Sequence, residues 1–175
     1  GPSLDESTRL GPLVSAAQRD RVIGFIEQGI QEGAEVVAGG PQKPAFDKGY
    51  FVQPTILRVK ATDTLAKEEI FGPVLALLPW SDEADLIAQC NDNDYGLASG
   101  IWTRDYKAAW RIGRALHTGT VWINTYKLFS VSTPFGGVKL SGTGREKGRL
   151  GILEYTSQKS FYWGLNEHPM PWATA

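Results

Sequence analysis

The sequence predicts an α/β protein with a mostly parallel sheet and flanking helices. Between positions 74 and 123, short runs of β-forming residues alternate with helical patterns, which implies parallel strands joined by crossover helices. A glycine-rich stretch, 134–146, follows one of these strands, and α/β sheets carry their ligand sites at such places. With 175 residues, 42% of them hydrophobic, the chain is long enough for one domain with a sizeable core.

The first half opens on an amphipathic helix. Ser15 followed by Gln18 forms a capping box, and apolar residues then recur on one face until Gly33. The expected elements are a helix over 16–32, a strand over 35–38, an extended segment over 51–59 that Pro54 interrupts, and a helical turn that holds 67–69.

The second half alternates strands and helices. Asp105 is a favourable N-cap because its carboxylate can accept the free amide protons of a first helical turn. The expected elements are strands over 74–78, 99–103, 120–123 and 159–163 and helices over 81–91, 106–116 and 146–153. The predicted boundaries are 1–154 for the main domain, 155–166 for a C-terminal strand and its arm, and 167–175 for a tail.

Charge and composition exclude several classes of function. The net charge is −1 with mixed signs, so no nucleic-acid or membrane partner is expected. One cysteine and two histidines argue against a disulfide framework or a metal site, and a cytoplasmic location fits. Cys90 shares a helix face with Leu86 and Ile87 and lacks a nearby histidine, so it is expected in the core and not as a nucleophile.

The stretch 134–146 is the strongest motif of the chain. It holds four glycines, one aromatic residue, the cations Lys139 and Arg145, and the carboxylate Glu146. A dinucleotide fingerprint would need a third glycine where Lys147 stands, so this is not a Rossmann phosphate loop. We expect Lys139 and Arg145 to anchor the loop by satisfying its carbonyl groups.

These residues resemble the C-terminal signature of the aldehyde dehydrogenase superfamily. Three further segments are similar to the same family in the same order: 10–14, 67–74 and 119–124. The resemblance implies the C-terminal part of the catalytic domain of an NAD(P)-dependent enzyme. It also implies a homo-oligomer, with a C-terminal strand that joins a sheet of a neighbouring subunit.

The resemblance implies roles for three residues near the cofactor and the general base. Glu69 would accept hydrogen bonds from the nicotinamide ribose hydroxyls, and Phe71 would pack against the nicotinamide side of NAD or NADP. Glu146 would relay protons through water to the general base. From sequence alone either carboxylate also fits a solvated helix end, and Glu146 also fits a structural ion pair.

The resemblance also points to the aldehyde site. Phe129 and Phe135 would line the aldehyde tunnel, as aromatics often line ligand pockets. Lys127 lies two residues before Phe129, where a cation would favour aldehydes that carry a negative group. The nucleophilic Cys, the general-base Glu and most of the NAD-binding domain are expected before Gly1, so the chain alone is expected to be inactive.

The implied reaction is attack of a thiolate on an aldehyde, hydride transfer to NAD or NADP, and hydrolysis to a carboxylic acid. Two alternatives stay open from the sequence. One is a non-catalytic assembly module. The other is a coenzyme A-acylating or phosphorylating member of the same superfamily.

Overall fold

The computed structural model describes residues 1–42, 46 and 48–165. The chain divides into two compact units, Gly1–Asp94 with Asp105–His117, and Tyr95–Arg104 with Thr118–Ala175. We call them the first and second units. The predicted tail, 167–175, lies outside the described residues, and the predicted domain boundaries stay predictions.

The first unit is built on helix α1, Ala16–Gln31. The Ser15 hydroxyl accepts a hydrogen bond from the amide of Gln18 at 3.1 Å, so the predicted N-cap is confirmed. Val22 and Ile26, one turn apart on the same face, are fully buried. The apolar periodicity therefore identified the face of α1 that forms the core.

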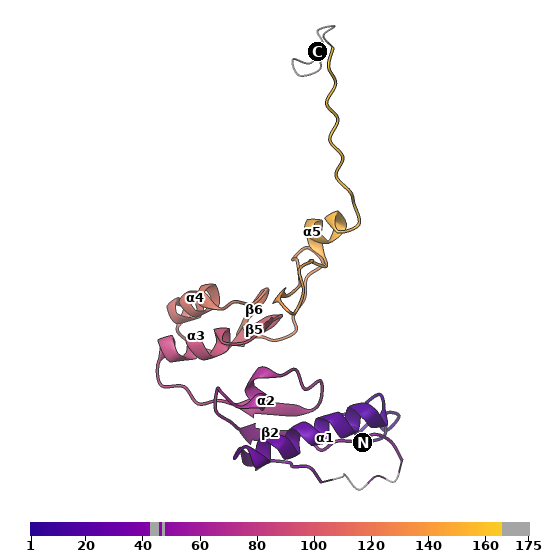
Figure 1. Ribbon diagram of the computed structural model, residues 1–175, viewed down its shortest axis with the longest axis vertical. Helices are drawn as coiled ribbons and strands as arrows, with labels where there is room; N and C mark the ends of the chain where they lie inside the picture. The colour runs from indigo at the N-terminus through magenta and orange to yellow at the C-terminus, as the bar shows by residue number, and fades with distance from the viewer. Residues whose placement is uncertain (43–45, 47, 166–175) are drawn as a thin grey trace, which may run out of the picture. The chain divides into compact units, whose positions relative to one another are not determined.

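That face covers a three-stranded sheet with the order β1-β2-β3 (Figure 1). Strand β1, Glu35–Ala38, pairs antiparallel with β2, Thr55–Arg58, and β2 pairs parallel with β3, Val74–Leu77. Leu57, in the central strand, has no exposed surface. The core consists of apolar residues from α1, β2 and the loops beside them: Val22, Ile26, Val52, Leu57, Val59, Leu65 and Ile70.

Three further helices belong to the first unit: α2 (Thr64–Lys67), α3 (Glu83–Asn91) and α4 (Tyr106–Ala115). The Asp105 carboxylate caps α4, as predicted, by accepting the amides of residues 107 and 108. Arg111 of α4 donates two hydrogen bonds to the Glu83 carboxylate of α3, at 3.0 and 2.8 Å. This bidentate pair links the two helices.

The prediction that Cys90 lies in the core is wrong, because its side chain is exposed on α3. The helix has no fully buried residue, so its apolar face is only partly covered in this chain. Partial shielding raises the pKa of the Cys90 thiol, which disfavours the reactive thiolate. That Cys90 is not a nucleophile stays a prediction.

The second unit contains two small sheets and one helix. Strands β5, Ala98–Ile101, and β6, Thr120–Ile123, pair in parallel, as the alternation of strands and helices predicted. Strands β4, Tyr95–Gly96, and β7, Val138–Lys139, form a short antiparallel pair that the sequence did not indicate. Helix α5, Gly148–Leu153, follows the glycine-rich stretch, and so begins two residues later than expected.

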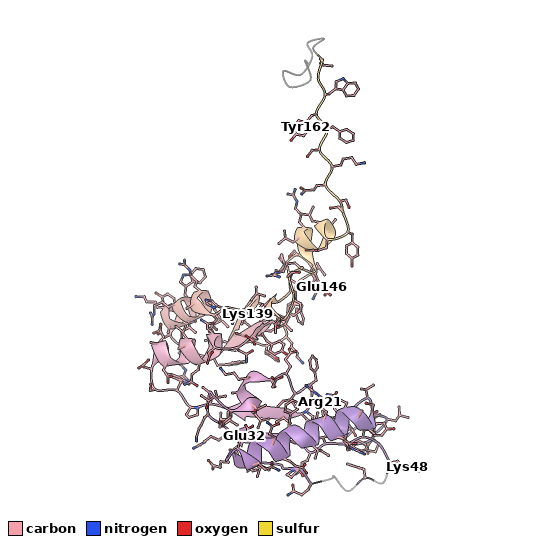
Figure 2. All side chains as sticks on the ribbon, viewed as in Figure 1. Arg21, Glu32, Lys48, Lys139, Glu146 and Tyr162 are labelled. Atoms are coloured by element: carbon pink, nitrogen blue, oxygen red, sulfur yellow. The ribbon has the colours of Figure 1, made fainter. Side chains whose placement is uncertain are left out.

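The strand predicted over 159–163 joins no sheet among the described residues. Beyond α5 the chain continues as an extended segment without regular secondary structure (Figure 1). Tyr162 points away from this segment and is 97% exposed (Figure 2). A strand forms only when another edge pairs with it, and no such edge meets this segment in the described chain. Pairing with another subunit stays a prediction.

Candidate functional site

Helix α1 fixes the turn that carries the predicted cofactor residues. The Arg21 guanidinium donates to the carbonyl oxygens of Ile70 and Glu69, at 2.7 and 3.0 Å. The Gln18 side chain donates to the carbonyl oxygen of Phe71 at 2.9 Å. Three successive carbonyl groups are therefore satisfied by two side chains of one helix, which holds the backbone of this turn in place.

The side chains of the turn are divided between the core and the surface. Ile70 is 8% exposed and anchors the turn, whereas Phe71 is 74% exposed. Phe71 has a φ of 51°, a left-handed conformation that costs an aromatic residue about 1–2 kcal/mol. Such backbone strain is concentrated at functional sites, because it aims a side chain where an ordinary turn would not.

The Glu69 carboxylate is half-buried, and none of the ion pairs of the described residues involves it. It therefore offers two acceptor oxygens for a ligand with two donors, such as a ribose diol. With the exposed ring of Phe71 two residues on, this turn fits the sugar and the flat base of a nicotinamide nucleotide.

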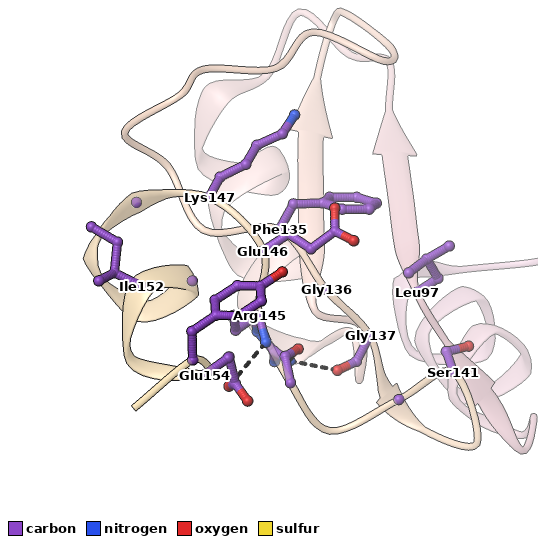
Figure 3. A pocket seen from close by; sticks show the side chains of 15 residues that line it. Leu97, Phe135, Gly136, Gly137, Ser141, Arg145, Glu146, Lys147, Ile152 and Glu154 are labelled. Atoms are coloured by element: carbon purple, nitrogen blue, oxygen red, sulfur yellow. Dashed lines mark hydrogen bonds between the residues drawn. The ribbon is translucent and has the colours of Figure 1, made fainter. Parts of the chain in front are cut away.

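The glycine-rich stretch closes on itself through backbone pairing. Phe135 and Glu146 exchange two backbone hydrogen bonds, at 2.9 and 2.7 Å, in an isolated antiparallel bridge. Arg145 donates to the carbonyl oxygens of Gly137 and Gly144, at 2.7 and 2.8 Å, and so anchors the loop as predicted (Figure 3). The predicted tunnel residue Phe135 is thereby placed directly opposite the predicted relay residue Glu146.

A pocket of about 810 Å³ lies in the second unit between this loop and α5. Six of its 15 lining residues are glycines, so much of its wall is backbone. A β-carbon on Gly136 would collide with the carbonyl oxygen of Gly144, which shows how closely two loop segments approach. The side chains of Phe135, Glu146 and Lys147 also line the pocket (Figure 3).

Five aromatic side chains of the second unit form what we call the aromatic cluster: Trp102, Trp122, Tyr126, Phe129 and Phe135. Trp122 of β6 is at its centre, 9% exposed, and its indole N–H donates to the carbonyl oxygen of Leu128 at 2.8 Å. Phe129 and Phe135 meet edge to face, with ring centroids 5.0 Å apart. The structure thus brings both predicted tunnel aromatics together.

Two lysines lie on rings of the aromatic cluster. The ammonium of Lys127 is 5.6 Å from the centroid of Tyr126, and that of Lys147 is 3.9 Å from the centroid of Phe129. Lys127 was predicted from the sequence, whereas Lys147 was not. A signal was present, since Lys147 occupies a position where the spacing of the glycines would have suited another glycine.

The predicted site residues fall in different units. Phe129, Phe135, Lys127 and Glu146 all lie in the second unit, around the aromatic cluster and the glycine-rich loop. Glu69 and Phe71 lie in the first unit. No ion pair to Glu146 occurs among the residues that the structure describes, and the neighbouring Arg145 is engaged with backbone carbonyls.

Several solved structures that resemble this chain are aldehyde dehydrogenases. The Mycobacterium tuberculosis aldehyde dehydrogenase in complex with NAD⁺ is similar, with a TM-score of 0.86 and 48% identity. The match covers 91% of this chain and 33% of that one. The fold is therefore that of part of an α/β domain found in aldehyde dehydrogenases. The model of the aldehyde dehydrogenase family matches residues 1–161, and the chain belongs to this family.

Two more relatives extend the comparison. The NAD⁺ complex of aldehyde dehydrogenase from Bacillus cereus has a TM-score of 0.86 and 45% identity, over 93% of this chain and 33% of that one. Betaine aldehyde dehydrogenase of Brucella anthropi is 46% identical over 175 residues, which are 98% of this chain and 36% of that protein. The chain therefore spans about a third of the length of its relatives.

Proposed function

We propose that this chain is the C-terminal part of the catalytic domain of an NAD-dependent dehydrogenase that oxidises an aldehyde to a carboxylic acid. The observation that carries the proposal is the family match across residues 1–161, together with 48% identity to a relative solved with NAD⁺. The described part of the chain also contains no helix long and apolar enough to cross a bilayer.

In this proposal the turn over 69–71 binds the nicotinamide riboside of NAD or NADP. The Glu69 carboxylate accepts hydrogen bonds from the ribose hydroxyls, and the Phe71 ring packs beside the nicotinamide. The cofactor, when bound, supplies the hydride acceptor. The chain's own contribution is orientation: Arg21 and Gln18 hold the turn by its carbonyl groups, so that it does not have to be ordered at the moment of binding.

The aldehyde is bound in the second unit. Phe129 and Phe135 form one wall of its tunnel, and their edge-to-face contact fixes the shape of that wall. Lys127 lies two residues before Phe129 and has a φ of 55°, a backbone conformation that few lysines adopt. Its positive charge favours the binding of aldehydes that carry a negative group.

Glu146 relays protons. Its side chain is exposed and its backbone is locked to Phe135, so its carboxylate is held beside the tunnel wall and in reach of water (Figure 3). A carboxylate in this place can relay protons, through water, to the general base.

In this proposal the chain alone is inactive, because it spans only about a third of the length of its relatives. The protein is a cytoplasmic homo-oligomer that assembles through its C-terminal segment. A single cysteine among 175 residues supports a reducing compartment.

The test is NAD-dependent oxidation of a panel of aldehydes by the whole protein that contains this chain, followed by the ultraviolet absorbance of NADH. Free carboxylic acid as the product supports the proposal. A product that forms only with coenzyme A or phosphate would assign a different reaction within the family, and no turnover of any aldehyde would refute dehydrogenation. Turnover by the 175-residue chain alone would refute its inactivity.

A further inference from the structure

Lys147 lies at the junction of the glycine-rich loop and α5, and its ammonium is only 3.9 Å from the centroid of the Phe129 ring. We propose that Lys147, with Lys127, makes the aldehyde site select substrates that carry a carboxylate and reject those that carry a quaternary ammonium group. This inference rests on the function proposed above, because it names the substrate class of that site.

The two lysines flank one continuous group of rings. Lys127 lies over Tyr126, and Lys147 lies over Phe129. Both of these rings contact Trp122, whose ring centroid is 5.3 Å from that of Tyr126 and 5.5 Å from that of Phe129. Two rings that both contact Trp122 therefore each carry an ammonium group.

Neither ammonium group is neutralised by an ion pair in the part of the chain that the structure describes. The cations of its ion pairs are Arg19, Arg58, Lys67 and Arg111. Lys147 is half-buried, so its charge is screened less by water than that of a fully exposed lysine. The Glu146 carboxylate lies beside the same wall, and together with it the two cations leave a net positive charge there. A net positive charge attracts an anionic substrate and repels a cationic one.

The same contacts occupy two of the ring faces in the cluster that could otherwise bind a quaternary ammonium group. Such groups are held over the open faces of aromatic rings. Here the faces of Phe129 and Tyr126 already carry the protein's own cations. A trimethylammonium group would have to displace an ammonium group and then remain close to it. Similarity to proteins named betaine aldehyde dehydrogenase therefore does not extend to the substrate charge.

The backbone of Lys147 is a second, independent observation. Its φ of 64° and ψ of 166° lie in a region that is essentially restricted to glycine. A lysine in this conformation lowers the stability of the folded protein, whereas glycine could adopt it without that cost. A lysine in such a conformation, with its ammonium on the ring of Phe129, supports a functional role for the side chain itself.

The experiment compares three aldehydes with the whole protein: 4-oxobutanoate, which is anionic, butanal, which is neutral, and trimethylammonioacetaldehyde, which is cationic. We expect kcat/KM to fall in that order. Lys147→Gly suits the backbone and so should fold with an equal or higher melting temperature. It should lower the ratio of kcat/KM for 4-oxobutanoate over butanal roughly tenfold, the loss of one charge-assisted contact.

Lys147→Arg keeps the charge and should retain most of the ratio, whereas Lys60→Ala removes an exposed lysine of the first unit and should not change it. Calorimetric titration with succinate gives a readout that does not need turnover, and its binding should weaken in Lys147→Gly. The inference is overturned if the ratio and succinate binding are unchanged in Lys147→Gly, or if the cationic aldehyde is the best substrate. If no aldehyde is turned over but succinate binding still weakens in Lys147→Gly, the proposed dehydrogenase function is refuted. The proposed carboxylate-binding site is then supported.

Discussion

The guanidinium of Arg145 donates a hydrogen bond to the carbonyl oxygen of Gly137 at 2.7 Å, across the loop that carries both Phe135 and Glu146. A second bond, to the carbonyl of Gly144, is 2.8 Å long. A loop so rich in glycine loses much conformational entropy when it becomes ordered, and its carbonyl groups lack regular partners. The Arg145 side chain satisfies two of these carbonyl groups and restrains the loop, which can then hold Phe135 and Glu146 in place.

The first prediction follows from this contact. Arg145→Met should destabilise the whole protein by about 1.5–3 kcal/mol, the range for hydrogen bonds to a charged group. Urea unfolding measures the change. Arg149→Met removes the same charge from an exposed position of α5 and should have little effect on the unfolding midpoint. Equal midpoints for the two variants would show that Arg145 does not anchor the loop.

The second prediction concerns two glycines with opposite surroundings. A β-carbon on Gly119 would lie against the backbone carbonyl of Gly136, which cannot give way without moving the glycine-rich loop. Gly119→Ala should therefore cost about 1–3 kcal/mol. Gly24→Ala, in the middle of α1 with open space around it, should stabilise by about 0.5–1 kcal/mol. If the two variants shift the melting temperature in the same direction, Gly119 is not crowded and Gly24 open in the way that the structure indicates.

Local signals predicted most elements of the chain correctly. Ser15 and Asp105 are N-caps because a side-chain oxygen next to free amides is a short-range interaction that the sequence displays directly. The parallel pairing of β5 with β6 followed from an intervening helix. The pairing of β4 with β7 was missed, because two residues on each side give no periodicity to detect.

Long-range contacts set the limits of prediction at the candidate site. Phe129 and Phe135 were selected through a family resemblance, and only the structure shows that they touch. Lys147 was missed because both its backbone conformation and its contact with Phe129 depend on how the loop closes. Cys90 was placed in the core because periodicity identifies an apolar face and does not say whether another element covers it.

The third prediction is a pH dependence. Hydrogen bonds from the Thr64 side chain, the Gln28 side chain and the Thr64 amide hold the pKa of Glu32 below its ordinary value. A lowered folded-state pKa contributes stability above the unfolded-state pKa, and this stability is lost as the pH falls through the folded-state value. Glu32→Gln should therefore lower the urea midpoint near neutral pH and leave it unchanged in strong acid. Glu27→Gln, at an exposed position of α1, is the matched control. An effect of Glu32→Gln that is independent of pH would exclude this linkage.

The fourth prediction concerns the cofactor. In the whole protein, Glu69→Gln should weaken NAD binding by about 1.5–3 kcal/mol, because an amide offers only one acceptor oxygen and no charge to the ribose hydroxyls. The KM for aldehyde should change much less. Glu68→Gln removes the charge of the exposed neighbouring carboxylate and should leave NAD binding as it is. Titration of NAD by fluorescence measures both variants, and unchanged affinity in Glu69→Gln would remove this residue from the cofactor site.

The last prediction concerns assembly through the segment 157–165. Its large apolar side chains point to both sides and are almost fully exposed, from 82% for Phe161 to 97% for Tyr162. An extended segment of β-forming residues with unpaired backbone groups favours pairing with another chain. We expect light scattering at micromolar concentration to show a dimer or larger species, and deletion of residues 157–175 to reduce its mass. Tyr155→Ser removes an equally exposed aromatic outside the segment and should leave the mass unchanged. A monomer whose mass changes only by the deleted residues would show that this segment mediates no assembly.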